Sequence, residues 1–148
     1  MILQDIYLPK YDWCVRVYYA VTTYLAERII VDMERIGCRG EQLRKAYANL
    51  RCGELDTGIT YSNFKAGESV MVISLTSTPA QFLNSWLHEM RHLSRHIEQA
   101  CGISPYGEEA AYLAGEIGQR MFPVAKRFIC EHCRKELVYG KIHRHIDK

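Results

Sequence analysis

The pattern of apolar and polar positions predicts four short strands in the first half of the chain. Residues 5–9 and 13–20 are rich in Ile, Tyr, Val and Trp, which are common in strands. Residues 58–64 and 69–75 have a similar composition and flank the polar segment 65–68. The second pair is therefore expected to be two strands joined by a turn at 65–68.

A helical period appears after the first two strands and again late in the chain. From about 22 to 50, apolar residues recur at steps of three and four, with an interruption at 37–40. This spacing predicts two helices. A further helix is predicted over 108–122, where we expect Pro123 to kink or end it because proline lacks a backbone N–H donor.

The most clearly delimited element is a helix that precedes Gly102. Thr78 is suited to cap its N-terminus, Pro79 suits its first turn, and Gln81 stands at the capping-box position. Gly102 provides a stop directly after Cys101. Seven apolar residues share one side of this helix and are expected to face the core: Phe82, Leu83, Trp86, Leu87, Met90, Leu93 and Ile97.

Composition indicates an ordinary globular chain. The 148 residues suit one domain over 1–148, and an apolar share of 48% with 24% charged residues argues against disorder. A net charge of +2 is too small to indicate nucleic acid as a partner, and no apolar run reaches the ~20 residues of a membrane span. The N-terminus has no signal-peptide pattern, so we expect a cytoplasmic protein whose six cysteines are reduced or bind metal.

The capped helix contains His88-Glu89-Met90-Arg91-His92, an HExxH motif. Residues four apart lie one above the other on a helix, so both imidazoles can reach one ion. Glu89 lies beside them and could hold a water on that ion and take its proton. The motif therefore predicts one catalytic zinc at His88 and His92, with Glu89 as general base and an open coordination position for water.

The competing interpretation of the motif is a solvated polar stripe, because His88, His92 and His96 lie opposite the expected core side. Such a stripe usually carries Lys and Glu, and here a helix with carboxylates at Glu108 and Glu109 follows after a short turn. Both facts favour zinc. His96 is an alternative ligand, but it lies about 12 Å along the helix from His88, so we do not expect one ion to bridge all three histidines.

A strand, an HExxH helix, a turn and a helix reading Glu-x-x-Ala-Tyr-Leu-Ala-Gly resemble a minimal gluzincin-type zinc metallopeptidase. The chain is similar in particular to small peptidases of bacteriophages and their bacterial hosts, which implies a bacterial or phage-infected host cell. The resemblance covers about 58–122. It implies a zincin-like α+β fold with a small mixed or antiparallel sheet, an HExxH active-site helix and a second, carboxylate-bearing helix.

The resemblance also implies three zinc ligands and one base, namely His88, His92, Glu108 and Glu89. Neighbours on a helix diverge by about 100°, so only one of Glu108 and Glu109 can face the histidines. Small residues share the side of Glu108 and favour it as the ligand. Tyr112 stands where many such peptidases have Asp or Asn, which often orient a metal-bound histidine.

A second metal site is possible in the basic tail, 124–148. Cys130 and Cys133 have zinc-knuckle spacing, and His143 and His145 follow them. These four residues predict a second, structural zinc. The alternative is a pair of reduced thiols one helical turn apart, followed by an unmetallated tail.

The expected function is zinc-dependent hydrolysis of a peptide bond in a peptide or protein substrate. One alternative is a zinc-binding scaffold without catalysis that interacts with phage or host proteins. Another is a SprT-like DNA-associated protease, which the tail favours although that family's later histidine motif is missing. The strand 69–75 would be either an edge that pairs with the peptide or a core strand. Candidates for stabilising the oxyanion are Tyr106, Tyr112 and Arg91, and no oligomeric state is indicated.

Overall fold

The computed structural model describes residues 2–21, 26–52, 57–130, 132 and 133. Over these residues the chain forms an α+β fold with a four-stranded mixed sheet. In chain order the elements are β1 Ile2–Leu8, η1 Pro9–Tyr11, β2 Trp13–Val21, α1 Ala26–Arg35, α2 Gly40–Cys52, β3 Gly58–Asn63, β4 Glu68–Ser74, α3 Pro79–Cys101 and α4 Glu108–Ile129. The four predicted strands and the break between α1 and α2 are confirmed. No helix in the described part of the chain is long and apolar enough to cross a membrane.

The strand order of the sheet is β1-β2-β4-β3. β1 and β2 are antiparallel, β2 and β4 are parallel, and β3 and β4 form the antiparallel pair around the 65–68 turn. β4 is therefore an interior strand, and the suggestion that 69–75 forms an edge is wrong. The physical reason is the uninterrupted apolar run Val70–Ile73, whose side chains are buried on both faces of the sheet.

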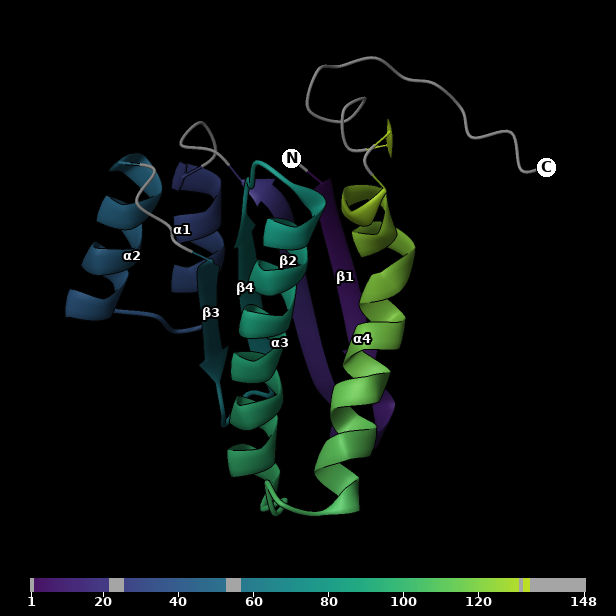
Figure 1. The fold of residues 1–148 in the computed structure, drawn as a ribbon. Helices are drawn as coiled ribbons and strands as arrows, with labels where there is room; N and C mark the ends of the chain where they lie inside the picture. Colours follow the sequence, from purple (N-terminus) through teal and green to yellow (C-terminus); the bar gives the residue numbers. More distant parts are fainter. Residues whose placement is uncertain (1, 22–25, 53–56, 131, 134–148) are drawn as a thin grey trace.

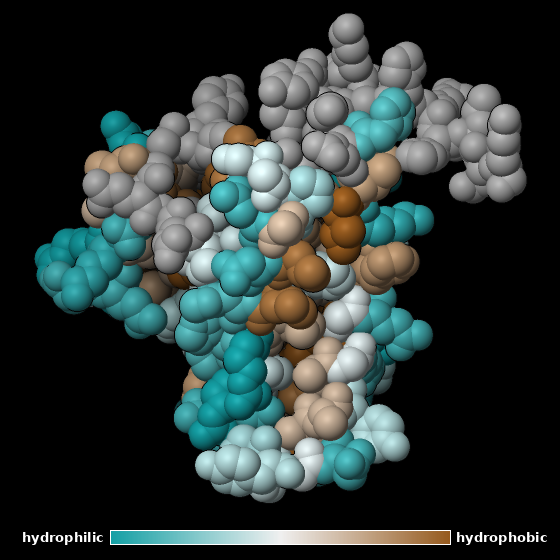
Figure 2. Space-filling view, viewed as in Figure 1, coloured by the Kyte–Doolittle hydropathy of each residue, from teal (hydrophilic) through white to brown (hydrophobic). Residues whose placement is uncertain are grey.

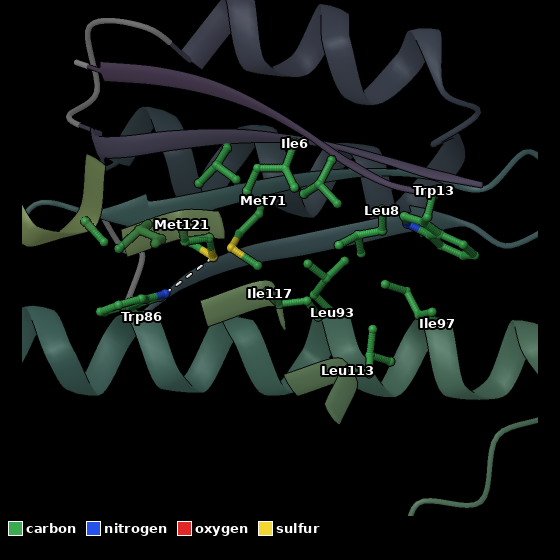
Figure 3. Close-up of a cluster of buried hydrophobic side chains, with 14 of the residues drawn as sticks. Ile6, Leu8, Trp13, Met71, Trp86, Leu93, Ile97, Leu113, Ile117 and Met121 are labelled. Carbon is green, nitrogen blue, oxygen red and sulfur yellow. Dashed lines mark hydrogen bonds between the residues drawn. The ribbon is translucent and has the colours of Figure 1, made fainter. Parts of the chain in front are cut away.

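The sheet lies between two pairs of helices (Figure 1). Val70 and Val72 point to one face, where they join a buried cluster with α1 and α2. Met71 and Ile73 alternate with them and join the cluster formed with α3 and α4 on the other face. Figure 3 shows this second cluster, in which the indole Nε1 of Trp86 lies 3.3 Å from the sulfur of Met121 and connects α3 to α4.

The boundaries of α3 are those that its capping residues predict. The hydroxyl of Thr78 accepts a hydrogen bond from the backbone N–H of Gln81 at 3.1 Å, and Pro79 is the first helical residue. Gly102 ends the helix in a left-handed conformation, with φ of 67°. A residue with a Cβ adopts this conformation only at a cost, so glycine is favoured here.

The buried side of α3 differs from the predicted one. Leu83 and Leu87 are 40% and 47% exposed. Figure 2 shows a hydrophobic surface where α3 and α4 meet. Four polar residues of α3 are buried in their place: Ser85, Glu89, Ser94 and Glu98. The helix is thus rotated toward β3, and it places an acid of the HExxH motif in the interior.

The second helix of this layer, α4, continues through Pro123 to Ile129, so Pro123 does not end the helix and a kink there stays a prediction. Proline removes one backbone hydrogen bond from the helix interior. The helix continues because Ala125 and Phe128, which follow the proline, are buried in the core cluster with α3. The ring of Phe128 stacks on that of Phe82 with 4.8 Å between centroids.

Candidate metal centre

The two histidines of the HExxH motif lie side by side on the exposed face of α3. Their Nε2 atoms are 3.2 Å apart and their ring centroids are 4.9 Å apart. Two ligands of a tetrahedral zinc with Zn–N bonds of about 2.0–2.1 Å are separated by roughly 3.3–3.4 Å. The observed separation of the Nε2 atoms therefore fits a pair of zinc ligands.

Two arginines flank the histidines on the same helix. The guanidinium groups of Arg91 and Arg95 each lie 3.3 Å from the carboxylate of Glu98, whose side chain is fully buried. A buried carboxylate of this kind requires cationic partners, because an unpaired charge is costly to bury. Both arginines are therefore ordered by Glu98.

Glu89, the expected general base, is only 2% exposed. Its carboxylate accepts two hydrogen bonds from β3 and the residue before it: from the hydroxyl of Thr57 at 2.9 Å and from that of Thr60 at 2.6 Å. The side chain thus contacts the sheet edge beneath α3, while the two imidazoles point to the surface. Two donors satisfy a buried acid well, so Glu89 also joins α3 to β3.

The close approach of β3 to Glu89 requires a glycine. Gly58 has φ of +153°, and a Cβ built on it would lie 1.8 Å from the backbone oxygen of Val72 and 3.1 Å from Cγ of Glu89. The contact with the backbone oxygen of Val72 leaves no room for a side chain. Gly58 therefore lets the strand lie close enough for Thr57 and Thr60 to reach the carboxylate.

The structure does not bring Glu108 to the histidine pair. Met90 of α3 packs against Gly118 of α4, which places the middle of α4 opposite the motif. Glu108 begins α4, ten residues before Gly118, which is a rise of roughly 15 Å along the helix. His92 also lies about 160° around α3 from Met90, away from α4. Among the described residues, no three His, Cys, Asp or Glu side chains form a group that could hold a metal.

The neighbouring carboxylate, Glu109, contacts two residues of η1. It lies 3.3 Å from the ammonium group of Lys10 in η1 and accepts a hydrogen bond from the hydroxyl of Tyr11 at 3.5 Å. Its contacts join α4 to the turn between β1 and β2. The assignment of Glu108 as the third ligand stays a prediction from the resemblance, and the described contacts of α4 do not support it.

His96 follows the pair one turn further along α3, with its ring centroid 6.5 Å from that of His92. Its Nδ1 lies 2.7 Å from the hydroxyl oxygen of Ser62 in β3. Burial, and secondly the charge of His92, lower the pKa of His96 below the value of an exposed histidine. The ring therefore stays neutral further into the acidic range than an exposed imidazole does.

The spacing of the HExxH motif identifies the histidines but not their neighbours on β3. Thr60 and Ser62 alternate with Ile59 and Tyr61, which pack against the cluster of α1 and α2. This alternation signals a strand with one polar side, and a polar side beside a histidine-bearing helix is the feature that could have indicated partners for Glu89 and His96.

Of the four residues predicted to form the second zinc site, Cys130, directly after α4, is exposed and Cys133 is half-buried. His143 and His145 lie outside the described residues. The second site therefore stays a prediction.

No family model matches the chain, and searches of curated proteins and of solved structures found no match either.

Proposed function

We propose that this protein hydrolyses peptide bonds with a zinc ion held by His88 and His92. The observation that carries the proposal is the 3.2 Å separation of the two Nε2 atoms on an exposed helix face. Two neutral imidazoles are a donor set that zinc prefers, and in catalytic sites it keeps a position open for water. The proposed substrate is a peptide or protein, as the resemblance implies.

When bound at such a site, zinc lowers the pKa of a coordinated water toward ~7 and so provides a nucleophile at neutral pH. Glu89 is the acid nearest to the histidines in sequence, and its carboxylate would accept the proton of that water. The hydroxyls of Thr57 and Thr60 orient the carboxylate through the bonds at 2.9 Å and 2.6 Å.

A second candidate function is a zinc-binding scaffold without catalysis. The observation that favours it is the burial of Glu89 and its two hydrogen bonds to threonine hydroxyls, because such a residue can serve to fasten α3 to β3. The two functions share the metal and differ in whether Glu89 transfers a proton.

The metal is tested by elemental analysis of purified protein. Wild-type protein is expected to bind zinc, and the double variant His88→Ala/His92→Ala is expected to lose one equivalent. Gln99→Ala is a control, because Gln99 is an exposed polar residue of the same helix. A double variant that keeps the full zinc content of the wild type contradicts the site.

The reaction is tested with Glu89→Gln on a pool of peptide substrates. The amide keeps the size of the side chain and an acceptor for one threonine hydroxyl, so the variant is expected to fold and keep its zinc. Hydrolysis is expected to fall by at least ~10²–10⁴-fold, the contribution of a positioned base. Equal activity of variant and wild type contradicts the role of Glu89, and activity in neither favours the scaffold.

A further inference from the structure

A chain of hydrogen bonds runs from the core of the protein to His96. The indole Nε1 of Trp13 donates to the hydroxyl of Ser69 at 2.8 Å, and the hydroxyls of Ser69 and Ser62 are 2.6 Å apart. The hydroxyl of Ser62 in turn lies 2.7 Å from Nδ1 of His96. Trp13 and Ser69 are buried, so water does not compete for the bond between them.

Trp13 determines which group donates in each of these hydrogen bonds. An indole N–H can only donate, so Ser69 accepts from Trp13 and has one proton of its own to give. That proton goes to Ser62. The proton of Ser62 then has an acceptor within this chain of hydrogen bonds only if it goes to Nδ1 of His96. If Ser62 instead donated to Ser69, then Ser69 would accept from both Trp13 and Ser62. Its own proton would then have no acceptor among these residues. Nδ1 of His96 is therefore an acceptor, and the proton of the neutral ring is on Nε2.

The position of His96 suits a partner of the substrate better than a ligand of the metal. Its ring centroid is 6.5 Å from that of His92, whereas the rings of His88 and His92 are 4.9 Å apart. An Nε2 that carries a proton also has no lone pair for a metal. Nε2 lies on the side of the ring away from Ser62, and the ring of Phe64, at 5.5 Å, packs beside it.

We propose that the Nε2–H group of His96 is the hydrogen-bond donor for the carbonyl oxygen of a peptide that lies over the His88–His92 pair. This inference rests on the proposed function. His96 is then a catalytic residue that stabilises the charge developing on that oxygen. Ser62, Ser69 and Trp13 are positioning residues, because they keep the proton on Nε2 and the ring in place.

The three donors suggested by the sequence are less suited to this role. Tyr106 and Tyr112 are 97% and 76% exposed and belong to the turn before α4 and to α4 itself, away from the histidine face. Arg91 is ion-paired with the buried carboxylate of Glu98. Of these four residues, only His96 combines a fixed ring with a place on the same helix face as the pair.

The first test measures the tautomer of His96 in metal-free protein by nitrogen-15 NMR. The long-range couplings are expected to show a protonated Nε2 and an unprotonated Nδ1. In Ser62→Ala the preference for this tautomer is expected to weaken, while in Ser104→Ala, an exposed serine in the turn between α3 and α4, it is expected to be unchanged. A proton on Nδ1 in the wild type overturns the inference, whatever the protein does with zinc.

The second test uses zinc-loaded protein and two probes in calorimetric titrations: a phosphonate dipeptide, whose oxygens imitate the developing charge, and a mercaptoacetyl dipeptide, which has a thiol in their place. His96→Ala is expected to weaken phosphonate binding about ten- to hundredfold, the effect of one hydrogen bond to a charged group. Thiol binding and zinc content are expected to stay within threefold of wild type. Gln99→Ala, an exposed position of the same helix, is the control and is expected to change neither.

The outcomes of the second test separate the two proposals. Wild-type protein that binds no zinc overturns the proposed function and this inference together. Zinc-loaded wild type that binds the phosphonate no better than His96→Ala, or not at all, overturns this inference alone. Loss of zinc in His96→Ala also overturns it, because His96 would then be a ligand.

Discussion

The carboxylate of Glu89 accepts its hydrogen bonds from the hydroxyl groups of Thr57, just before β3, and of Thr60 in β3, and the contribution of these bonds can be measured. Thr60→Val keeps the shape of the side chain but removes the donor at 2.6 Å. A buried carboxylate that loses a donor is expected to destabilise the fold by about 1–3 kcal/mol. Urea unfolding measures the change, and Thr76→Val, whose hydroxyl contacts only an exposed backbone oxygen, is the control. A change below ~0.5 kcal/mol for Thr60→Val would mean that Glu89 does not need this bond.

A second buried acid, Asp32 of α1, lies on the opposite face of the sheet. Burial opposes its charge, but hydrogen bonds from Tyr18, Arg16 and Arg35 outweigh this effect and lower the pKa of the carboxyl. Burial, and secondly the contact with Asp32, raise the pKa of Tyr18 to about 12. Asp32 therefore helps to hold α1 on β2 while it is ionised.

The lowered pKa of Asp32 predicts a pH dependence of stability. A carboxyl with a depressed pKa in the fold stabilises the fold above its unfolded pKa of ~3.9, and this contribution is lost as the pH falls through the folded value. Asp32→Asn is expected to cost about 2–3 kcal/mol at pH 6, and the difference from wild type is expected to shrink below about pH 4. Asp5→Asn removes the exposed partner of the same Arg16 and is expected to cost at most ~1 kcal/mol. A pH-independent difference between wild type and Asp32→Asn would contradict this assignment.

At the scale of single residues, the sequence was informative where the chemistry is local. His88, Glu89 and His92 are found from their spacing within one helix, and the structure brings the two imidazoles together. The partners Thr57 and Thr60 lie about thirty positions away on another element, and no local pattern connects them to Glu89.

The helices and strands show the same division between local and distant causes. The ends of α3 follow from Thr78 and Gly102, because caps act on the turns beside them. The buried side of α3 depends on what packs against it, and β3 presents polar groups there, so Leu83 is exposed and Ser85 is buried. The interior position of β4 likewise depends on the parallel pairing with β2, which no turn between neighbouring strands reveals.

The packing of α4 on α3 gives an expectation for the two adjacent carboxylates that differs from the one implied by the resemblance. Because Glu108 lies roughly 15 Å along α4 from the level of the histidines, Glu108→Ala is expected to change zinc affinity less than threefold. Glu109→Ala is also expected to change zinc affinity less than threefold. It is expected to reduce stability slightly, because the ion pair with Lys10 is lost. Competition of each variant with a fluorescent zinc chelator measures the affinity. A loss of tenfold or more in Glu108→Ala alone would support Glu108 as the third ligand and mean that α4 shifts when metal binds.

For the molecule as a whole, α3 is the element through which the metal and the fold are connected. Its inner side packs on the sheet through Leu93 and Ile97, and its outer side bears the histidine pair. The two imidazoles are neighbours only while α3 is helical, so zinc at this pair binds the folded chain in preference to the unfolded one. By linkage, such binding stabilises the entire fold.

This linkage gives a prediction that also separates the two candidate metal sites. Zinc added to chelator-treated protein at a hundred times its dissociation constant is expected to raise the free energy of unfolding by up to about 2.7 kcal/mol, less any binding by cysteines of the unfolded chain. Thermal unfolding with and without zinc measures the gain. His88→Ala/His92→Ala is expected to abolish the gain, whereas Cys130→Ser is expected to keep it and, if the tail binds metal, to lose one of two zinc equivalents. A gain that disappears in Cys130→Ser and persists in the double histidine variant would place the stabilising metal at the tail and contradict the site on α3.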